Sequence, residues 1–324
     1  MNRLAIFLNF LLAACAPYFQ PAGALIQAPT LTGDRIVAAD GAELPLKSWL
    51  PEGEAQVVIL ALHGFNDYLN GFAAPGEFWA GHGIATYAYD QRGFGRAPNP
   101  GVWPGTAALT ADLETAAALI AVRHAGRPLY LVGDSMGGAV ILAAVAEGRA
   151  LPAAGIVLVA PAVWGRTTMP FYQRAALWLA ANTVPWLKVR GTSLGILPSD
   201  NLPMLRKRGA DPLIIKDTRI DSVQGLVDLM DTALAAGPAL RLPTLLQYGA
   251  HDQVIPPIPM RKMIADLPPD AARHWRIAIY RDGYHMLLQD LKAEIPLADI
   301  VAWTKGGAAN RTPLPSGADA AARD

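Results

Sequence analysis

The 324-residue sequence is poor in cysteine and in charge. Its one cysteine cannot form an intramolecular disulfide or assemble a thiolate metal site. Charged residues make up only 17%, and 27 basic residues balance 27 acidic ones, so nothing indicates a surface for nucleic acid. The hydrophobic fraction of 52% is high for a soluble domain. These values exclude a disulfide scaffold, argue against nucleic-acid binding and indicate extensive apolar internal surfaces.

The single cysteine, Cys15, follows an apolar run near the N-terminus. Residues 4–14 are apolar except for Asn9, and Arg3 precedes them. The run is shorter than the ~20 apolar residues that span a bilayer, but it suits the central region of a secretory signal. The four residues that end at Cys15, Leu-Ala-Ala-Cys, resemble the lipobox of bacterial lipoproteins, whose signal peptide is removed just before a lipidated cysteine.

The lipobox resemblance predicts a signal peptide of residues 1–14 and a mature protein held at a membrane through lipidated Cys15. Several acyl chains anchor a protein firmly, whereas one chain alone binds only marginally. We expect a location in the bacterial cell envelope, in the outer membrane where there is one, because Ala16 is not the aspartate associated with inner-membrane retention. Ordinary signal cleavage, for example after Ala24, and a chance match are the alternatives.

The rest of the chain divides into a tether, one folded domain and a tail. Residues 15–32 carry Pro, Ala and Gln without sustained periodicity, and this predicts a tether between anchor and domain. Residues 33–305 contain the periodic segments of the predicted domain. Residues 306–324 are rich in Gly, Ala and Pro and are predicted to be a disordered tail.

Short apolar runs within the domain predict a central sheet, since continuous β-rich runs of this length are typical of strands buried on both faces. Helical patterns at 110–124 and 136–147 alternate with them, which predicts an α/β fold with a mostly parallel sheet and helices on both faces. The predicted strands are residues 35–39, 44–50, 57–62, 85–89, 129–133, 156–160, 245–249 and 275–280.

The alternation is interrupted between residues 161 and 240, where helical stretches are separated by Pro and Gly. Such an insertion is expected to lie above the strand ends as a helical cap, where ligands enter. Its apolar side chains indicate a path for an acyl chain, or alternatively a face that only packs the cap onto the body. The candidate substrate contacts in the cap are Trp164, Met169, Phe171 and Trp178.

A G-x-S-x-G pattern places Ser135 between the strand 129–133 and the helix 136–147. A serine nucleophile has to be raised above the sheet on a sharp turn, and only small neighbours tolerate the close approach of the backbone there. The helix that follows directs its N-terminal amides at the point where negative charge develops. This context predicts Ser135 as a nucleophile. The alternative is a glycine-rich turn with an incidental serine.

The partners of such a serine follow it in the order acid, then histidine. His285 lies in a loop after the last predicted strand, and a neutral imidazole is suited to remove the serine proton. Asp252 follows the preceding strand and is placed to orient His285. Three other residues are considered and set aside, namely Asp282 as a competing acid and His251 and His274 as loop or surface histidines.

An oxyanion at the serine needs two fixed donors, usually backbone amides. Met136 supplies one, directly after the nucleophile. The second is expected after the strand 57–62, where the sequence reads His63-Gly64-Phe65 and the Phe65 amide is expected to face the serine. His63 is interpreted as structural.

With these residues placed, residues 35–303 resemble the monoacylglycerol lipase and lysophospholipase group of α/β-hydrolases. The group's Asp-x-Arg-Gly-x-Gly stretch appears at Asp90–Gly95 and is interpreted as a turn at the active-site rim, because it lacks the third glycine or the lysine of a nucleotide loop. The resemblance implies a serine esterase for lipid-like substrates that needs no metal or organic cofactor. An acyltransferase, a small-peptide serine peptidase and a catalytically silent lipid-binding lipoprotein are the alternatives.

Overall fold

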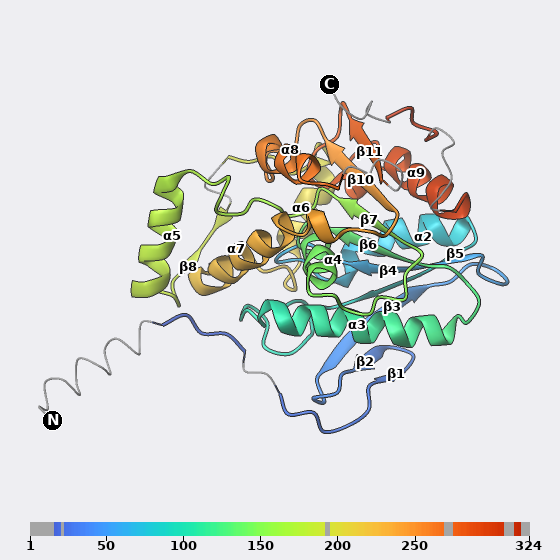
Figure 1. The fold of residues 1–324 in the computed structure, drawn as a ribbon, viewed down its shortest axis with the longest axis horizontal. Coiled ribbons are helices and arrows are strands. Elements are labelled where there is room, and N and C mark those ends of the chain that lie inside the picture. Colours follow the sequence, from blue (N-terminus) through green and yellow to red (C-terminus); the bar gives the residue numbers. More distant parts are fainter. Residues whose placement is uncertain (1–15, 21–22, 192–194, 269–274, 308–313, 319–324) are drawn as a thin grey trace, which may run out of the picture.

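The computed structural model describes residues 16–20, 23–191, 195–268, 275–307 and 314–318 (Figure 1). The predicted signal peptide, Cys15 and His274 lie outside these residues. In the described part of the chain, no helix is long and apolar enough to cross a membrane.

The described strands form a nine-stranded sheet with the order β1-β2-β3-β5-β4-β6-β7-β10-β11. From β5 to β11 all neighbours are parallel, and the β1–β3 edge is antiparallel. This arrangement confirms the predicted α/β fold. The strands are β1 Thr30–Leu31, β2 Arg35–Val37, β3 Glu43–Trp49, β4 Val57–Leu62, β5 Ile84–Tyr89, β6 Leu129–Asp134, β7 Gly155–Val159, β10 Thr244–Gly249 and β11 Trp275–Tyr280.

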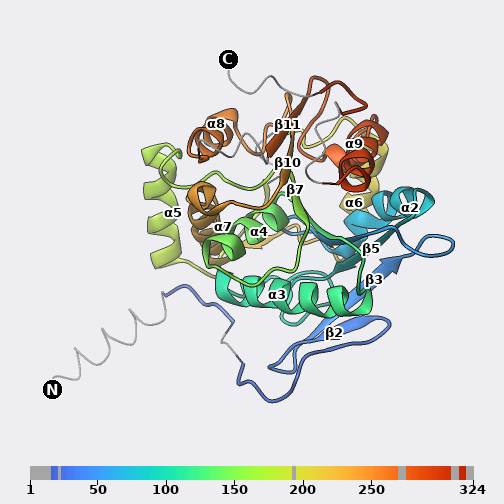
Figure 2. The same cartoon turned by 45° about the vertical axis from the view of Figure 1, so that its right-hand side comes forward.

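Helices cover both faces of the sheet, which is why its central strands are continuously apolar (Figure 2). Along β4, Val58 and Leu60 belong to one core and Val57 and Ile59 to the other. Burial of each such side chain contributes about 1.5–3 kcal/mol. One core lies under α3 Thr106–Arg123, α4 Met136–Ala146, α7 Ile220–Leu234 and α8 Pro257–Ala265, and the other under α2 Ala73–Gly81 and α9 Glu294–Lys305.

The cap is shorter than the predicted interval 161–240. It consists of α5 Phe171–Thr183, the antiparallel pair β8 Lys188–Val189 and β9 Thr218–Arg219, and α6 Leu202–Ala210. Helix α7 instead belongs to the body, where Val227, Met230 and Leu234 join the same core as α4. An apolar helix face has the same spacing in the sequence whether it packs against another helix or lines a ligand site. The sequence pattern therefore does not show whether α7 belongs to the body or to the cap.

The tether and the tail also differ from the prediction. In the tether, the Gln20 amide donates to the Trp103 carbonyl at 2.9 Å, and β1 pairs with β2. In the tail, the Ile279 amide donates to the Ala318 carbonyl at 2.9 Å, and Ser316 hydrogen-bonds Asp299. Residues 16–20, 23–31 and 314–318 are therefore held on the body by backbone hydrogen bonds, which composition alone does not reveal.

Candidate active site

Ser135 lies on the sharp turn between β6 and α4. Its backbone has φ 49° and ψ −110°, a left-handed conformation that is strained for a residue with a side chain. A Cβ at Gly133 would lie 2.4 Å from the Gly138 nitrogen, and one at Gly137 would lie 2.1 Å from the Leu62 oxygen. Both glycines of the pattern are thus required by close backbone contact, and the turn holds the serine at the carboxyl end of the sheet.

His285 joins the serine to an acid. Its Nε2 lies 3.0 Å from Ser135 Oγ, and its Nδ1 lies 2.8 Å from Asp252 Oδ2. The other Asp252 oxygen, Oδ1, accepts hydrogen bonds from the amides of Val254 and Ile255 at 2.8 and 2.9 Å. The structure therefore brings the three predicted residues together with the acid fixed on both oxygens.

The residues set aside on sequence grounds lie away from this chain of contacts. Asp282 is exposed and pairs with Lys292 at 2.7 Å. His251 stacks on the ring of Tyr284, with 5.3 Å between the ring centroids.

The predicted oxyanion donors lie in the loop after β4 and at the start of α4, both of which adjoin the nucleophile. A Cβ at Gly64 would lie 3.5 Å from Ser135 Cβ, which places the loop after β4 directly beside the serine. Among the described residues, neither the Phe65 amide nor the Met136 amide donates a hydrogen bond to the protein. Met136 is also the first residue of α4, where helical amides have no partner within the helix. Both amides are therefore available to an anionic oxygen.

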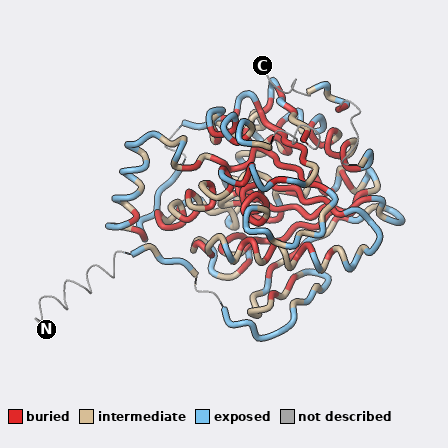
Figure 3. The backbone as a smooth tube through the Cα atoms, in the orientation of Figure 1, coloured by how far each residue is buried: buried red, intermediate tan, exposed pale blue. Residues whose placement is uncertain are grey.

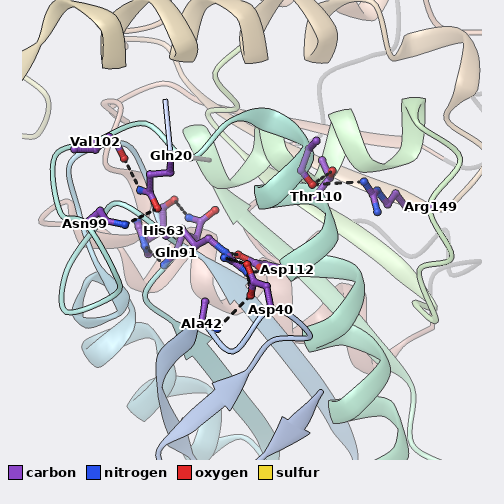
Figure 4. A network of polar contacts seen from close by, with 12 residues as sticks. Gln20, Asp40, Ala42, His63, Gln91, Asn99, Val102, Thr110, Asp112 and Arg149 are labelled. Atoms are coloured by element: carbon purple, nitrogen blue, oxygen red, sulfur yellow. Dashed lines mark hydrogen bonds and ion pairs between the residues drawn. The ribbon is translucent and has the colours of Figure 1, made fainter. Parts of the chain in front are cut away.

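His63 holds the loop after β4 in place, as its structural interpretation predicts (Figure 4). Its Nε2 accepts a hydrogen bond from the Gln91 amide at 3.0 Å, and Nδ1 lies 2.9 Å from the Gly64 carbonyl. Arg92, which follows Gln91, forms ion pairs with the carboxylates of both Asp40 and Asp112. The Asp90–Gly95 stretch thus forms a rigid turn behind the oxyanion loop.

The four cap residues predicted to contact substrate do not form one site. Trp164 and Met169 are half-buried and pack against the core of the body. Phe171 and Trp178 are 81% and 66% exposed on the outer side of α5, the exposed helix at the left of Figure 3. The apolar face of α5 is therefore not packed against the body, and the substrate-lining role of these two side chains stays a prediction.

Comparison with known proteins agrees with this geometry. Residues 53–292, more than half of the chain, match the family described as "Serine aminopeptidase, S33". The chain belongs to this family. It is 22% identical to the monoacylglycerol lipase of Mycolicibacterium smegmatis over 81% of this chain and 93% of the relative, and 25% identical to human monoglyceride lipase over 79% and 84%. The predicted group, the monoacylglycerol lipase-like α/β-hydrolases, and the predicted class, a serine hydrolase, are confirmed.

Solved structures support the fold of this hydrolase. A soluble variant of monoglyceride lipase from Saccharomyces cerevisiae superposes with a TM-score of 0.71 and 20% identity, and covers 89% of this chain and 98% of its own. The monoacylglycerol lipase of Paleococcus ferrophilus superposes with a TM-score of 0.69 and 20% identity, over 82% and 99%. Both are similar in architecture across nearly their whole length.

One half-buried acidic group beside the nucleophile of this hydrolase was missed on sequence grounds. Asp134 is the last residue of β6, and burial raises its pKa to about 7, with the charges of His285 and Arg208 opposing the shift and those of Asp67 and Asp252 adding to it. Its only sequence signal is a carboxyl at the second position of the G-x-S-x-G pattern. Asp134 is therefore a second ionisable group beside the nucleophile, and its raised pKa has to be distinguished from the raised pKa of His285.

The pKa of His285 predicts how activity of the hydrolase depends on pH. Burial alone would lower this pKa, but the hydrogen bond and charge of Asp252 outweigh it and raise the pKa above its ordinary 6.5. The base must be neutral, so we expect kcat/KM to fall as the pH decreases through this raised pKa, with the acid limb above pH 6.5. Rate measurements from pH 5 to 9 with a nitrophenyl ester check this.

Asp134→Asn separates the two titrating groups in the same experiment. Because the Asp134 charge raises the pKa of His285, the variant should keep the acid limb but move it to lower pH. Disappearance of the limb in this variant would assign it to Asp134 and contradict the prediction.

Proposed function

We propose that this protein is a serine esterase that cleaves the carboxylic ester of monoacylglycerols or lysophospholipids through an acyl-serine intermediate. The observation that carries the proposal is the position of His285, within hydrogen-bonding distance of both Ser135 Oγ and Asp252 Oδ2. The names of the relatives, monoacylglycerol lipase and monoglyceride lipase, support the substrate class.

The proposed reaction proceeds in two halves. His285 Nε2 takes the hydroxyl proton of Ser135 as Oγ attacks the ester carbonyl carbon, and the Phe65 and Met136 amides donate to the resulting oxyanion. Collapse breaks the bond to the alcohol, which leaves with the proton from His285. A water molecule, deprotonated by His285, then attacks the acyl carbon; the bond to Ser135 Oγ breaks, His285 returns the proton to Oγ, and the fatty acid is released.

A substrate panel tests the proposal. The protein from Ala16 onward is the suitable soluble form, because residues 16–20 are hydrogen-bonded to the body. We expect fatty acid release from monoacylglycerols or lysophospholipids of graded chain length, with little cleavage of aminoacyl nitroanilides. Cleavage of the nitroanilides without ester hydrolysis would favour the peptidase named by the family. Failure of Ser135 to react with a fluorophosphonate probe would favour a silent lipid-binding protein.

A lipid anchor at Cys15 is proposed as the link to the membrane. The described chain begins beside α5 in both views (Figures 1 and 2). Large apolar side chains are exposed on α5 and just after it, so an anchor at this end of the chain would bring them near the lipid surface. They include Phe171, Tyr172, Trp178, Leu179, Trp186 and Leu187.

Cys15→Ser tests the anchor. A single lipidation site predicts that the variant, expressed in a bacterial host, loses incorporation of labelled fatty acid and leaves the membrane fraction. Replacing Ala16 instead should leave both unchanged. Retention of the label in the serine variant would contradict lipidation and favour ordinary signal cleavage.

A further inference from the structure

Phe65 and His285 lie in loops that follow two strands which are not neighbours in the sheet. The loop after β4 carries Phe65, and the loop after β11 carries His285. Between β4 and β11 the sheet order places β6, β7 and β10. Pairing of the strands fixes their registers, but it does not by itself fix the distance between these two loops. Contacts beyond strand pairing have to hold that distance, because a displacement of about 1 Å is enough to lower a rate about 100-fold.

One end of the cap segment 197–218 is bonded to the His285 loop. The Met286 amide donates to the Pro198 carbonyl at 2.9 Å, one residue from His285. Ser199 Oγ donates to Asp290 Oδ1 at 2.6 Å, and the other oxygen of Asp290 accepts from the Tyr284 amide at 2.8 Å. The two neighbours of His285 in the chain are thus both held, directly or through Asp290, by this end of the segment.

The other end of the same segment is bonded to the oxyanion loop. Arg208 on α6 forms an ion pair with the buried carboxylate of Asp67 at 2.9 Å, and Asn66 Nδ2 donates to Thr218 Oγ1 at 2.7 Å. Two further contacts are the Ile215 amide to the Asn66 carbonyl at 3.0 Å and the Tyr68 hydroxyl to Asp211 at 2.7 Å. Asn66 and Asp67 directly follow Phe65, so the donor lies next to these bonds.

Helix α6 joins the two ends and contributes little to the core. None of its residues is buried, although a helix placed by the hydrophobic effect buries an apolar stripe. Its start is capped by Asn201, whose side chain accepts from the Met204 amide at 3.2 Å and donates to the Gln289 carbonyl at 2.9 Å. The helix is therefore positioned mainly by polar contacts at its ends, and those contacts lead to the two catalytic loops.

We propose that residues 197–218 form a brace that sets the Phe65 amide against His285, with Asp67 and Arg208 as positioning residues. The inference rests on the proposed esterase function for its kinetic consequences. In this proposal the cap covers the site and also positions catalytic groups, so that a shift of α6 would displace the Phe65 amide in the oxyanion hole.

The test replaces the ion pair and measures kcat and KM separately with a soluble nitrophenyl ester. Arg208→Gln should lower kcat about 10- to 100-fold with KM changed less than about threefold, because transition-state contacts are lost and ground-state binding is kept. Arg208→Lys should retain most of the activity. The matched control is Arg190→Gln, which removes an exposed ion pair with Asp217 at 2.8 Å and leaves the Arg208–Asp67 and Asn66–Thr218 contacts in place.

A second variant covers the case in which Arg208→Gln does not fold, since it leaves the buried Asp67 carboxylate without its partner. Thr218→Val keeps the shape of the side chain and removes the oxygen that accepts the hydrogen bond from Asn66 Nδ2. It should lower kcat about 3- to 10-fold, as expected for a partly displaced donor. Wild-type kcat in whichever of these variants fold would overturn the brace.

Hydrogen exchange separates this inference from the proposed function. Loss of the Arg208 contact at one end of the brace should speed amide exchange at residues 284–289 at the other end, relative to Arg190→Gln. If the wild-type protein has no esterase activity, the proposed function fails while the exchange result still decides the brace. Unchanged exchange at residues 284–289 in a folded Arg208 or Thr218 variant would overturn it.

Discussion

Ser135→Ala is expected to lower kcat/KM on a nitrophenyl ester by about 10⁴-fold or more, and to abolish labelling by a fluorophosphonate. The variant has no oxygen to attack the carbonyl carbon, whereas His285, Asp252 and the oxyanion donors keep their places. The turn itself should survive, because its shape depends on the close contacts at Gly133 and Gly137. Thermal unfolding should therefore stay within a few degrees of the wild type.

Ser222→Ala is the matched control for this variant. Its hydroxyl donates to the Gly101 carbonyl at 3.0 Å and takes no part in the triad. Its removal should cost about 1 kcal/mol of stability and leave kcat/KM within about twofold. If Ser135→Ala retained wild-type turnover, Ser135 would not be the nucleophile and the esterase mechanism would be wrong.

The triad could be found in the sequence because each member follows a strand. Ser135, Asp252 and His285 come after the strands β6, β10 and β11, and the carboxyl ends of parallel strands meet at one edge of the sheet. Local pattern and chain order were thus enough to bring together residues 33 and 150 positions apart. The glycines around Ser135 add a backbone requirement that the structure shows atom by atom.

Features that depend on how separate elements pack against each other could not be predicted from local sequence patterns. The spacing of Phe171 and Trp178 indicates an apolar helix face, but it does not say what covers that face. Helix α7 also has an apolar face, and that face lies in the body. The hydrogen bond between Asn66 and Thr218 joins residues 152 positions apart, and no sequence motif around either residue indicates that they meet. Such contacts follow from the packing of the cap, which the periodicity of either segment does not encode.

Asp252→Asn is expected to lower kcat by about 10⁴-fold even though its shape hardly changes. Asp252 Oδ1 accepts from the Val254 and Ile255 amides, so the asparagine carbonyl will take that place and its NH₂ group will face His285. That group donates to Nδ1 and so places the imidazole proton on Nε2. An Nε2 that already carries a proton cannot remove the one on Ser135, and the base is lost through the wrong tautomer.

The competing carboxyl provides the control for this substitution. Asp282→Asn changes an exposed group paired with Lys292, so kcat should stay within about twofold of the wild type. The residual activity of Asp252→Asn should also have its acid limb at lower pH, because the hydrogen bond and charge that raise the pKa of His285 are gone. Equal losses in the two asparagine variants, or an unmoved acid limb in Asp252→Asn, would show that Asp252 is not the partner that orients His285.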